Sequence, residues 1–452
     1  MSRDVPPRGS FLAIAALSLG TAVTAIDGHI VAPALPTLAQ DFGVDQSTSV
    51  LLVTSYQLVF LMALLPFSAL GDRLGHLRIY RIGQVSFALA SGLCYFAETF
   101  SHLLILRAVQ ALGAAASLSV SAALIKSVYP PSRLGRGMGV NSTIVAVGTA
   151  SAPLLGALLL SVGHWRWMFA AAAPFALLSL LFGLSIPRSP PRSKSFDLLG
   201  AVICASTFGL LGVGLGKSVE GGSAMAAAAL IGAGLLLGTL FVRRELGRER
   251  PILPLDLLRK PDLALSVVAT LTAFMAAMMM FVSLPFRLQS DYGYSPVELG
   301  VVIAAWPLTM VVVAPIAGEL SDRFSSARLS AIGMLFAAAA IASFALLPAD
   351  PRLGEMVLRM ALCGAGFGLF FPPNSRLILA SAPPARSASA GSLISTVRLI
   401  GQALGATFAS ALLALGLGTG IIPALVAASL AVAAALVSLG RARAGARTDS
   451  PP

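Results

Sequence analysis

Charged side chains are scarce in this chain. Asp, Glu, Lys and Arg make up 11% of its 452 residues, whereas hydrophobic residues make up 57%. Soluble domains carry roughly 25% charged residues, which help to cover their surface in water. The composition therefore excludes a soluble globular protein and indicates that most of the chain lies in a membrane.

Cysteine is also scarce. Cys94, Cys204 and Cys363 all lie in apolar stretches, and their odd number and wide spacing fit neither a disulfide framework nor a metal site. No paired carboxylates and no nucleophile with its base lie at membrane depth. We therefore expect no metal, no cofactor and no enzymatic activity, and we interpret the cysteines as small packing residues.

Acidic residues are outnumbered, 19 against 31 basic ones, which gives a net charge of +12. A basic chain of this kind suggests a nucleic-acid partner only if the charges form a patch. Here they lie in short connectors between apolar stretches. We attribute the charge to membrane topology, because Lys and Arg collect on the cytoplasmic side, and we expect no nucleic-acid partner.

Long apolar stretches recur along the chain, and each is close to the roughly 20 residues that a helix needs to cross the hydrocarbon core. We expect fourteen spans, at 11–35, 50–70, 82–99, 102–125, 138–161, 167–186, 198–215, 223–242, 264–285, 296–317, 328–347, 354–376, 388–413 and 420–440. The predicted fold is therefore an all-α integral membrane protein in contact with the lipid bilayer.

A polar motif between two spans occurs twice, as Ser-Ala-Leu-Gly-Asp-Arg-Leu-Gly-His-Leu-Arg at 68–78 and as Gly-Glu-Leu-Ser-Asp-Arg-Phe-Ser-Ser-Ala-Arg at 318–328. The shared charged residues are Asp72, Arg73 and Arg78 in the first copy and Asp322, Arg323 and Arg328 in the second. The repeat indicates a duplicated bundle. Many secondary transporters are built in this way, with a central site between two repeats that rock against each other.

The two copies lie 250 residues apart, more than the roughly 200 that six spans with short loops require. We assign the excess to one extra helical hairpin. The predicted domains are an N-terminal six-helix bundle at 1–190, two extra transmembrane helices at 191–245, and a C-terminal six-helix bundle at 246–452. The last follows a basic cytoplasmic linker and ends in a cytoplasmic tail.

Ionisable side chains inside spans cost about 2.5–3.5 kcal/mol or more, so each one calls for a reason. Asp27 is the only acid that we place clearly within a span, and Arg107 lies on the fourth span. Asp27 either exchanges a proton near neutral pH or faces water at the outer mouth. Arg107 must face the bundle interior, where it has either a functional role or only holds packed helices together. Arg398, on the thirteenth span, either binds substrate charge or extends to an interface.

Two further groups of residues complete the candidate site. Gly148, Pro153 and Gly156 allow close helix approach and a bend in the fifth span, which suits a rocking interface. Plausible substrate-cavity residues are Tyr56, Gln57, Asn141, Phe274, Phe281 and Trp306, together with Arg398.

These motifs, in this order, resemble the major facilitator superfamily and, within it, the branch of fourteen-helix drug:proton antiporters. The segments that carry the resemblance lie at 27–36, 68–78, 107–113, 148–156 and 165–169. Ser68, His76, Ala111, Ala152 and Ala32 depart from the pattern, and Ala152 replaces the glycine taken as the mark of exporters.

The resemblance implies proton-driven efflux of hydrophobic drugs or other small amphiphilic compounds, and hence drug resistance. Asp27 and Arg107 would be the coupling pair, with His29 as the other titratable group on that helix. Asp72, Arg73, Arg78, Asp322 and Arg323 would form a conformational latch. One buried acid suits a hydrophobic cation or a neutral compound. We expect a monomer in the cell (inner or plasma) membrane that uses the proton gradient as its energy source.

Two alternatives stay open. The loss of glycine at Ala152 permits a proton-independent facilitator or importer of a small metabolite in the same fold. A receptor that transports nothing is the other, although the duplication and the intramembrane charges argue against it.

The distribution of basic residues predicts the topology. With a cytoplasmic N-terminus, 24 of the 31 Lys and Arg residues fall in cytoplasmic segments. We therefore expect an impermeant thiol reagent to label Asp45→Cys in intact cells, and Arg248→Cys only after permeabilisation. Labelling of position 248 from outside would invert the topology.

Overall fold

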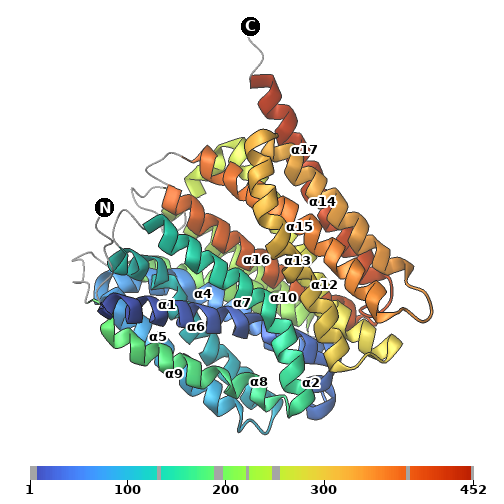
Figure 1. The fold of residues 1–452 in the computed structure, drawn as a ribbon, viewed down its shortest axis with the longest axis horizontal. Helices are drawn as coiled ribbons and strands as arrows, with labels where there is room; N and C mark the ends of the chain where they lie inside the picture. Colours follow the sequence, from blue (N-terminus) through green and yellow to red (C-terminus); the bar gives the residue numbers. More distant parts are fainter. Residues whose placement is uncertain are drawn as a thin grey trace. The chain divides into compact units, whose positions relative to one another are not determined.

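The computed structural model describes residues 8–129, 134–187, 197–219, 223–246, 255–382 and 387–448. All regular structure in these residues is helical (Figure 1). The N-terminal helices are α1 (Arg8–Ile30), η1 (Ala32–Ala34), α2 (Leu35–Phe42), α3 (Gln46–Ser49), α4 (Leu51–Leu74), α5 (His76–Cys94), α6 (Phe100–Val128), α7 (Leu134–Val162), α8 (Arg166–Ala170), α9 (Ala172–Phe182) and η3 (Gly183–Ser185). The remainder are α10 (Leu198–Val219), α11 (Ala224–Leu246), η4 (Leu255–Arg259), α12 (Pro261–Tyr292), α13 (Pro296–Arg323), α14 (Ser326–Ala342), η5 (Ser343–Leu346), α15 (Leu353–Ser381), α16 (Ser387–Ala414) and α17 (Ile422–Thr448).

Every predicted span coincides with helix, so the all-α prediction is confirmed for the described residues. Twelve helical segments in this part of the chain are long and apolar enough to cross a membrane, and α10 and α11 are among them. The helices outside the twelve are α5, α7 and the short helix η4. The total of fourteen spans, and a membrane location for the α10–α11 hairpin, remain predictions.

The outer face of α5 is nevertheless apolar. Its exposed side chains Ile82, Val85, Leu89 and Leu93 recur every three or four residues, and Phe96 continues the row. This spacing puts them on one side of the helix. Such a row is expected of a helix that faces lipid, and His76, Arg78 and Arg81 in its first two turns explain why the helix as a whole is less apolar.

The first predicted span is not one continuous helix. Helix α1 ends at Ile30, and the chain continues through η1 and α2, where Pro33 and Pro36 remove backbone donors. Helix α11 also continues beyond the predicted span at 223–242, so that Arg243 and Arg244, expected at the start of the basic linker, lie in its last turn. Cations there interact favourably with the helix dipole. The rest of the linker lies partly outside the described residues.

Backbone contacts group the helices into two compact units. One contains α1 and α4–α9. The other contains the segment 32–50 and α12–α17, and α10 and α11 are divided between them. This grouping follows contacts alone, so the predicted three-part division of the chain remains a prediction.

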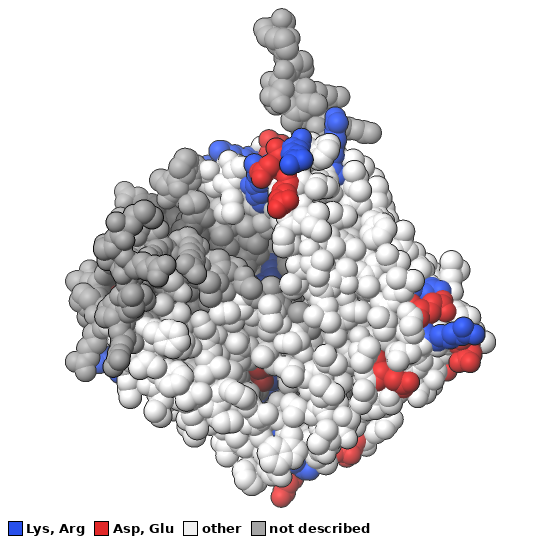
Figure 2. Space-filling view, viewed as in Figure 1, with Lys and Arg blue, Asp and Glu red and all other residues white. Residues whose placement is uncertain are grey.

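Charged side chains on the face seen in Figure 2 gather in small groups, and the surface between them carries almost no charge. Large apolar side chains such as Leu235, Val312 and Leu436 are exposed on different helices. An uncharged, apolar surface of this kind is expected where helices face hydrocarbon.

Glycine contacts at corresponding places bring helices close together in both units. In the first unit, a Cβ atom on Gly113 of α6 would lie 2.6 Å from the Phe87 backbone nitrogen and 2.7 Å from the Gly83 carbonyl oxygen of α5. In the second, a Cβ atom on Gly333 of α14 would lie 2.8 Å from the Gly366 carbonyl oxygen of α15. Gly83 and Gly333 are again 250 residues apart. The duplication is therefore visible in helix packing as well as in the polar motif.

The contact at Gly113 predicts a difference between two glycine substitutions. Gly113→Ala forces a methyl group against backbone atoms, and we expect it to destabilise the protein by about 1–3 kcal/mol. Gly92→Ala is the matched control, because a Cβ atom there meets no atom within 4 Å. Thermal unfolding in detergent should show a lower midpoint for Gly113→Ala alone, and equal midpoints would contradict the packing.

Candidate functional site

Asp27 and Arg107 form a buried ion pair in the first unit. Each side chain is 1% exposed, and Arg107 Nη1 donates to Asp27 Oδ2 at 2.9 Å. The two residues lie 80 positions apart, on α1 and α6. The structure therefore brings together the two intramembrane charges that the sequence singled out in this half of the chain, and the reading in which Asp27 faces open water is not what the structure shows.

Gln110 connects the two charged groups. It lies three residues after Arg107 on the same face of α6 and accepts from Arg107 Nη1 through its Oε1 atom at 2.6 Å. Its Nε2 atom donates to Asp27 Oδ1 at 2.9 Å and to Ser91 Oγ on α5 at 2.8 Å. Gln110 and Ser91 are both 0% exposed. Sequence reasoning missed both, although Gln110 lies within the motif at 107–113.

Both oxygens of the Asp27 carboxylate accept hydrogen bonds from these donors. Such an arrangement fits the ionised acid, because protonation would convert one acceptor oxygen into a donor. It also offsets part of the large desolvation penalty of two buried charges. A proton added to Asp27 would break one of these bonds and leave the Arg107 cation without its counter-ion.

Aromatic rings enclose the guanidinium. The carbon at its centre lies 4.2 Å from the centroid of the Tyr56 ring on α4 and 5.4 Å from that of Phe169 on α8. Cations are attracted to aromatic faces at these distances, more strongly when water is excluded. Tyr56 therefore belongs to the network around Arg107, and the neighbouring Gln57 is also buried.

Helix α7 packs closely on α1 on either side of Asp27. A Cβ atom on Gly148 would lie 3.2 Å from the Ala25 Cβ, and one on Gly156 would meet the carbonyl oxygen of Ile30. Pro153 lies between these glycines inside α7. On the same pair of helices, Thr21 Oγ1 donates to Asn141 Oδ1 at 3.1 Å. The motif expected at a moving interface thus lies against the helix that carries the buried acid.

The two copies of the polar repeat make different ion pairs. In the first, His76 Nε2 lies 3.2 Å from Asp72 Oδ1. In the second, Arg376 of α15 pairs with Asp322 of α13 and donates to Ser321 Oγ at 3.0 Å. The ion pairs found among the described residues do not include Arg73, Arg78 or Arg323. The latch role of these residues remains a prediction, with His76 and Arg376 as the observed partners.

The second unit contains a connected set of aromatic rings. Phe274 stacks on Phe371 with ring centroids 4.4 Å apart, Phe281 lies 5.1 Å from Trp306, and Trp306 lies 4.6 Å from Phe367. Three of the predicted cavity residues are therefore linked. Phe367 and Phe371 on α15 carried no sequence signal beyond being apolar.

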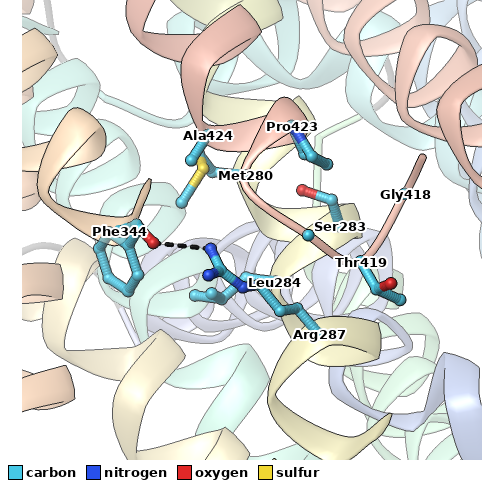
Figure 3. Close-up of a pocket in the computed structure, with 10 residues that line it drawn as sticks. Met280, Ser283, Leu284, Arg287, Phe344, Gly418, Thr419, Pro423 and Ala424 are labelled. Atoms are coloured by element: carbon cyan, nitrogen blue, oxygen red, sulfur yellow. Dashed lines mark hydrogen bonds between the residues drawn. The ribbon is translucent and has the colours of Figure 1, made fainter. Parts of the chain in front are cut away.

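Arg287 follows the predicted span at 264–285, and the sequence analysis counted it among the few basic residues outside the cytoplasmic segments, in an external connector. The structure does not place it in a connector. It lies within α12, is 7% exposed, and its Nη1 donates to the carbonyl oxygen of Phe344 at 2.6 Å (Figure 3). A small pocket beside it is lined by residues that include Met280, Ser283 and Thr419. Helix α12 continues to Tyr292, beyond the predicted span, and Arg287 lies in this extension. Glu245, at the end of α11, is a second buried acid that the sequence did not single out.

The comparison with known families identifies this architecture. A sequence profile of the Major Facilitator Superfamily matches residues 17–406, with a second match at 265–451. The chain therefore belongs to the Major Facilitator Superfamily and is an integral membrane transporter. This confirms the family named from the motifs, and the fourteen-helix antiporter branch remains a proposal.

Three relatives show the range within the family. The chain is 41% identical over 430 residues to the uncharacterized transporter YebQ of Escherichia coli, with 94% of each chain covered. It is 29% identical over 401 residues to the riboflavin transporter RibZ of Clostridioides difficile, covering 88% of this chain and 87% of that one. It is 27% identical over 405 residues to the multidrug efflux pump LfrA of Mycolicibacterium smegmatis, covering 88% of this chain and 80% of that one.

The fold is shared with solved transporters. The structure of a POT family transporter in complex with a thioalcohol-conjugated peptide aligns with a TM-score of 0.74 over 98% of this chain and 97% of that one. The identity is 15%, so the likeness shows the fold alone.

The pair between Asp322 and Arg376 leads to a prediction about motion rather than stability. Their side chains are 68% and 49% exposed. Exposed pairs contribute about 0–1 kcal/mol, so Asp322→Asn should hardly change the thermal midpoint in detergent. If the pair stabilises one conformation of the transport cycle, the same change should slow transport at unchanged substrate affinity.

The change Asp72→Asn should act in the same direction, through the other copy of the repeat. Glu319→Gln is the matched control, because it neutralises another exposed acid one turn before Asp322. Initial rates of vesicle uptake, set against binding constants of the purified variants, give the measurement. Normal transport rates in both aspartate variants would contradict the latch role. The repeat would then serve only as a tight connector between helices.

Proposed function

We propose that this transporter exports small amphiphilic compounds across the inner membrane in exchange for protons. The observation that carries the proposal is the buried network of Asp27, Arg107 and Gln110, in which the guanidinium and the amide both donate to the Asp27 carboxyl group. An intramembrane acid of this kind is the feature expected of a proton relay. LfrA, named a multidrug efflux pump, is a relative over most of the chain and supports the direction of transport.

The proposed coupling follows from the hydrogen bonds. Protonation of Asp27 removes its negative charge. Arg107 then keeps the Gln110 amide oxygen, a 3.5 Å contact to the Asp27 carbonyl oxygen and the rings of Tyr56 and Phe169, none of which carries a compensating charge. An uncompensated buried cation is costly, so the protonated form favours a different arrangement of α1 against α6. Substrate binding and proton release then select opposite conformations, which is the requirement for antiport.

A facilitator or importer is the second candidate. Ala152 stands where exporters of the resembling branch have glycine, and the relative RibZ is named a riboflavin transporter. The two candidates differ in whether protons move. In the antiport proposal the termini are cytoplasmic, a single copy of the chain suffices, and the proton gradient is the only energy source.

Inverted membrane vesicles test the proposal. Respiration acidifies their lumen, and a pH-sensitive dye reports the gradient. Substrate added outside should alkalinise the lumen if the protein is an antiporter, whereas a facilitator moves substrate with no proton signal and a receptor does neither. A panel of toxic amphiphilic compounds, chosen by susceptibility tests in a strain that lacks its own pumps, supplies the substrates.

We expect Asp27→Asn to abolish uphill transport in this assay while substrate exchange across equal concentrations survives, because exchange needs no net proton movement. Asp45→Asn is the matched control, since it makes the same chemical change at an exposed position before α3. Full proton-driven transport by Asp27→Asn would leave His29 as the remaining titratable group on α1, or no proton coupling at all.

A double variant separates coupling from folding. Asp27→Asn alone leaves a buried arginine unpaired, and Arg107→Gln alone leaves a buried acid unpaired, so each should cost about 3–5 kcal/mol of stability. Asp27→Asn with Arg107→Gln replaces the ion pair by two amides and should recover most of that loss. We expect the double variant to remain uncoupled, and recovery of coupling would show that the pair is only structural.

A further inference from the structure

The second unit presents two helix faces whose side chains meet in successive layers. Thr270, Phe274 and Phe281 recur at helical spacing on α12, and Phe367, Phe371 and Asn374 do so on α15. In one layer Asn374 Nδ2 donates to Thr270 Oγ1 at 2.7 Å. In the next, Phe274 stacks on Phe371, and in the third Phe281 reaches Phe367 through Trp306 of α13.

The five rings Phe274, Phe281, Trp306, Phe367 and Phe371 form an aromatic wall, and they differ in exposure. Trp306 and Phe367 are buried, whereas Phe274, Phe281 and Phe371 are only partly buried. Buried rings fix the positions of their neighbours, and the partly exposed rings present a flat apolar surface. Ligand sites are typically built in this way, from aromatic walls with a small number of polar groups.

Helix α16 places a positive charge beside this wall. Arg398 shares one face of α16 with Gly401 and Gly405, three and seven residues further on. A Cβ atom on Gly401 would lie 2.8 Å from the Phe274 Cβ and 2.7 Å from the Leu271 carbonyl oxygen, and one on Gly405 would meet Met275. The two helices therefore run in the same direction there. Arg398 lies one turn earlier, near the level of Thr270.

Among the described residues, Arg398 has no carboxylate partner. The arginine ion pairs found there join Arg107 to Asp27, Arg359 to Glu355 and Arg376 to Asp322, and none of them includes Arg398. The Arg398 side chain is partly buried, and its Nε atom is buried and makes no hydrogen bond. A guanidinium stays protonated in proteins, so its partly exposed end remains a donor for an acidic group.

We infer that the second unit binds a planar aromatic organic anion, with its ring against Phe274 and Phe371 and its acid group on Arg398. A guanidinium fork matches a carboxylate or sulfonate in geometry and charge. The inference rests on the proposed function and names a substrate class for it. It differs from the expectation of a hydrophobic cation or neutral compound, which stays a prediction. Both oxygens of Asp27 are already engaged by Arg107 and Gln110.

A matched series of ligands tests the inference. The probes are 2-naphthoate, neutral 2-naphthalenemethanol and cationic 2-naphthylmethylammonium, which share a ring system and differ in charge. Isothermal titration calorimetry on the full chain in lipid nanodiscs, with empty nanodiscs as the blank, measures binding at equilibrium. We expect naphthoate to bind about tenfold or more tightly than the alcohol, as charge-assisted bonds to arginine provide.

Substitutions at Arg398 and Phe274 test the charged and the aromatic part of the site separately. Arg398→Gln should weaken naphthoate binding about tenfold or more and leave the alcohol unchanged, whereas Arg398→Lys should restore part of the preference. Phe274→Leu should weaken both ligands. Arg352→Gln, the same change at the exposed cap of α15, is the control and should change neither. Thermal unfolding of each variant shows whether it is folded, and Arg398→Lys carries the test if Arg398→Gln is not.

The result that overturns the inference is a cation or alcohol that binds as tightly as naphthoate, naphthoate that does not bind, or an anion preference that survives Arg398→Gln. These outcomes are independent of the vesicle assay. Anion binding without a proton signal would remove the antiport proposal alone, and proton-coupled transport without anion binding would remove this inference alone.

Discussion

The buried ion pair between Asp27 and Arg107 is the constraint on which the first unit depends. Two charges removed from water must lie within hydrogen-bond distance of each other, and every remaining polar atom near them needs a partner. Gln110 and Ser91 continue the network from the Asp27 carboxyl group only if α5 and α6 approach closely, which Gly113 permits. The hydrogen bonds around the ion pair therefore depend on the close packing of α5 and α6 at small residues. Arg107 Nε is buried without a hydrogen bond, and the rings of Tyr56 and Phe169 lie against the guanidinium. The proposed proton coupling depends on the same pair, because a proton added to Asp27 would remove the charge that balances Arg107.

The second unit shows what duplication preserves and what it releases. The glycine contact of α5 with α6 recurs between α14 and α15, because helices that cross at backbone distance tolerate no side chain there. The polar repeat kept its acids at Asp72 and Asp322 but exchanged their partners. His76 follows Asp72 by one turn, whereas Arg376 comes from a different helix and ties α13 to α15. The close helix contacts at glycine are therefore similar in the two units, whereas the exposed ion pairs of Asp72 and Asp322 differ.

The charges of the two units are arranged differently. In the first, an acid and a base neutralise each other inside a closed network. In the second, no carboxylate among the described residues pairs with Arg398, which lies one turn before the contact of α16 with Phe274. A neutral ion pair suits a group that must exchange a proton, and a charge without a counter-ion near aromatic rings suits a group that must hold a ligand. The proposed division of labour between the halves follows from this asymmetry.

The sequence by itself determined the membrane class, the duplication and the pair of intramembrane charges in the first half. These follow from composition, spacing and rarity, since the cost of placing a residue in hydrocarbon is largely local. Only the tertiary structure decided that α1 ends at Ile30, that Arg287 is buried in α12, and that Gln110 joins Asp27 to Arg107. It also decided that Phe371 belongs with Phe274. Such contacts depend on how helices far apart in the chain are rotated against each other. The position of a polar or aromatic residue in the sequence therefore does not show which residue it contacts.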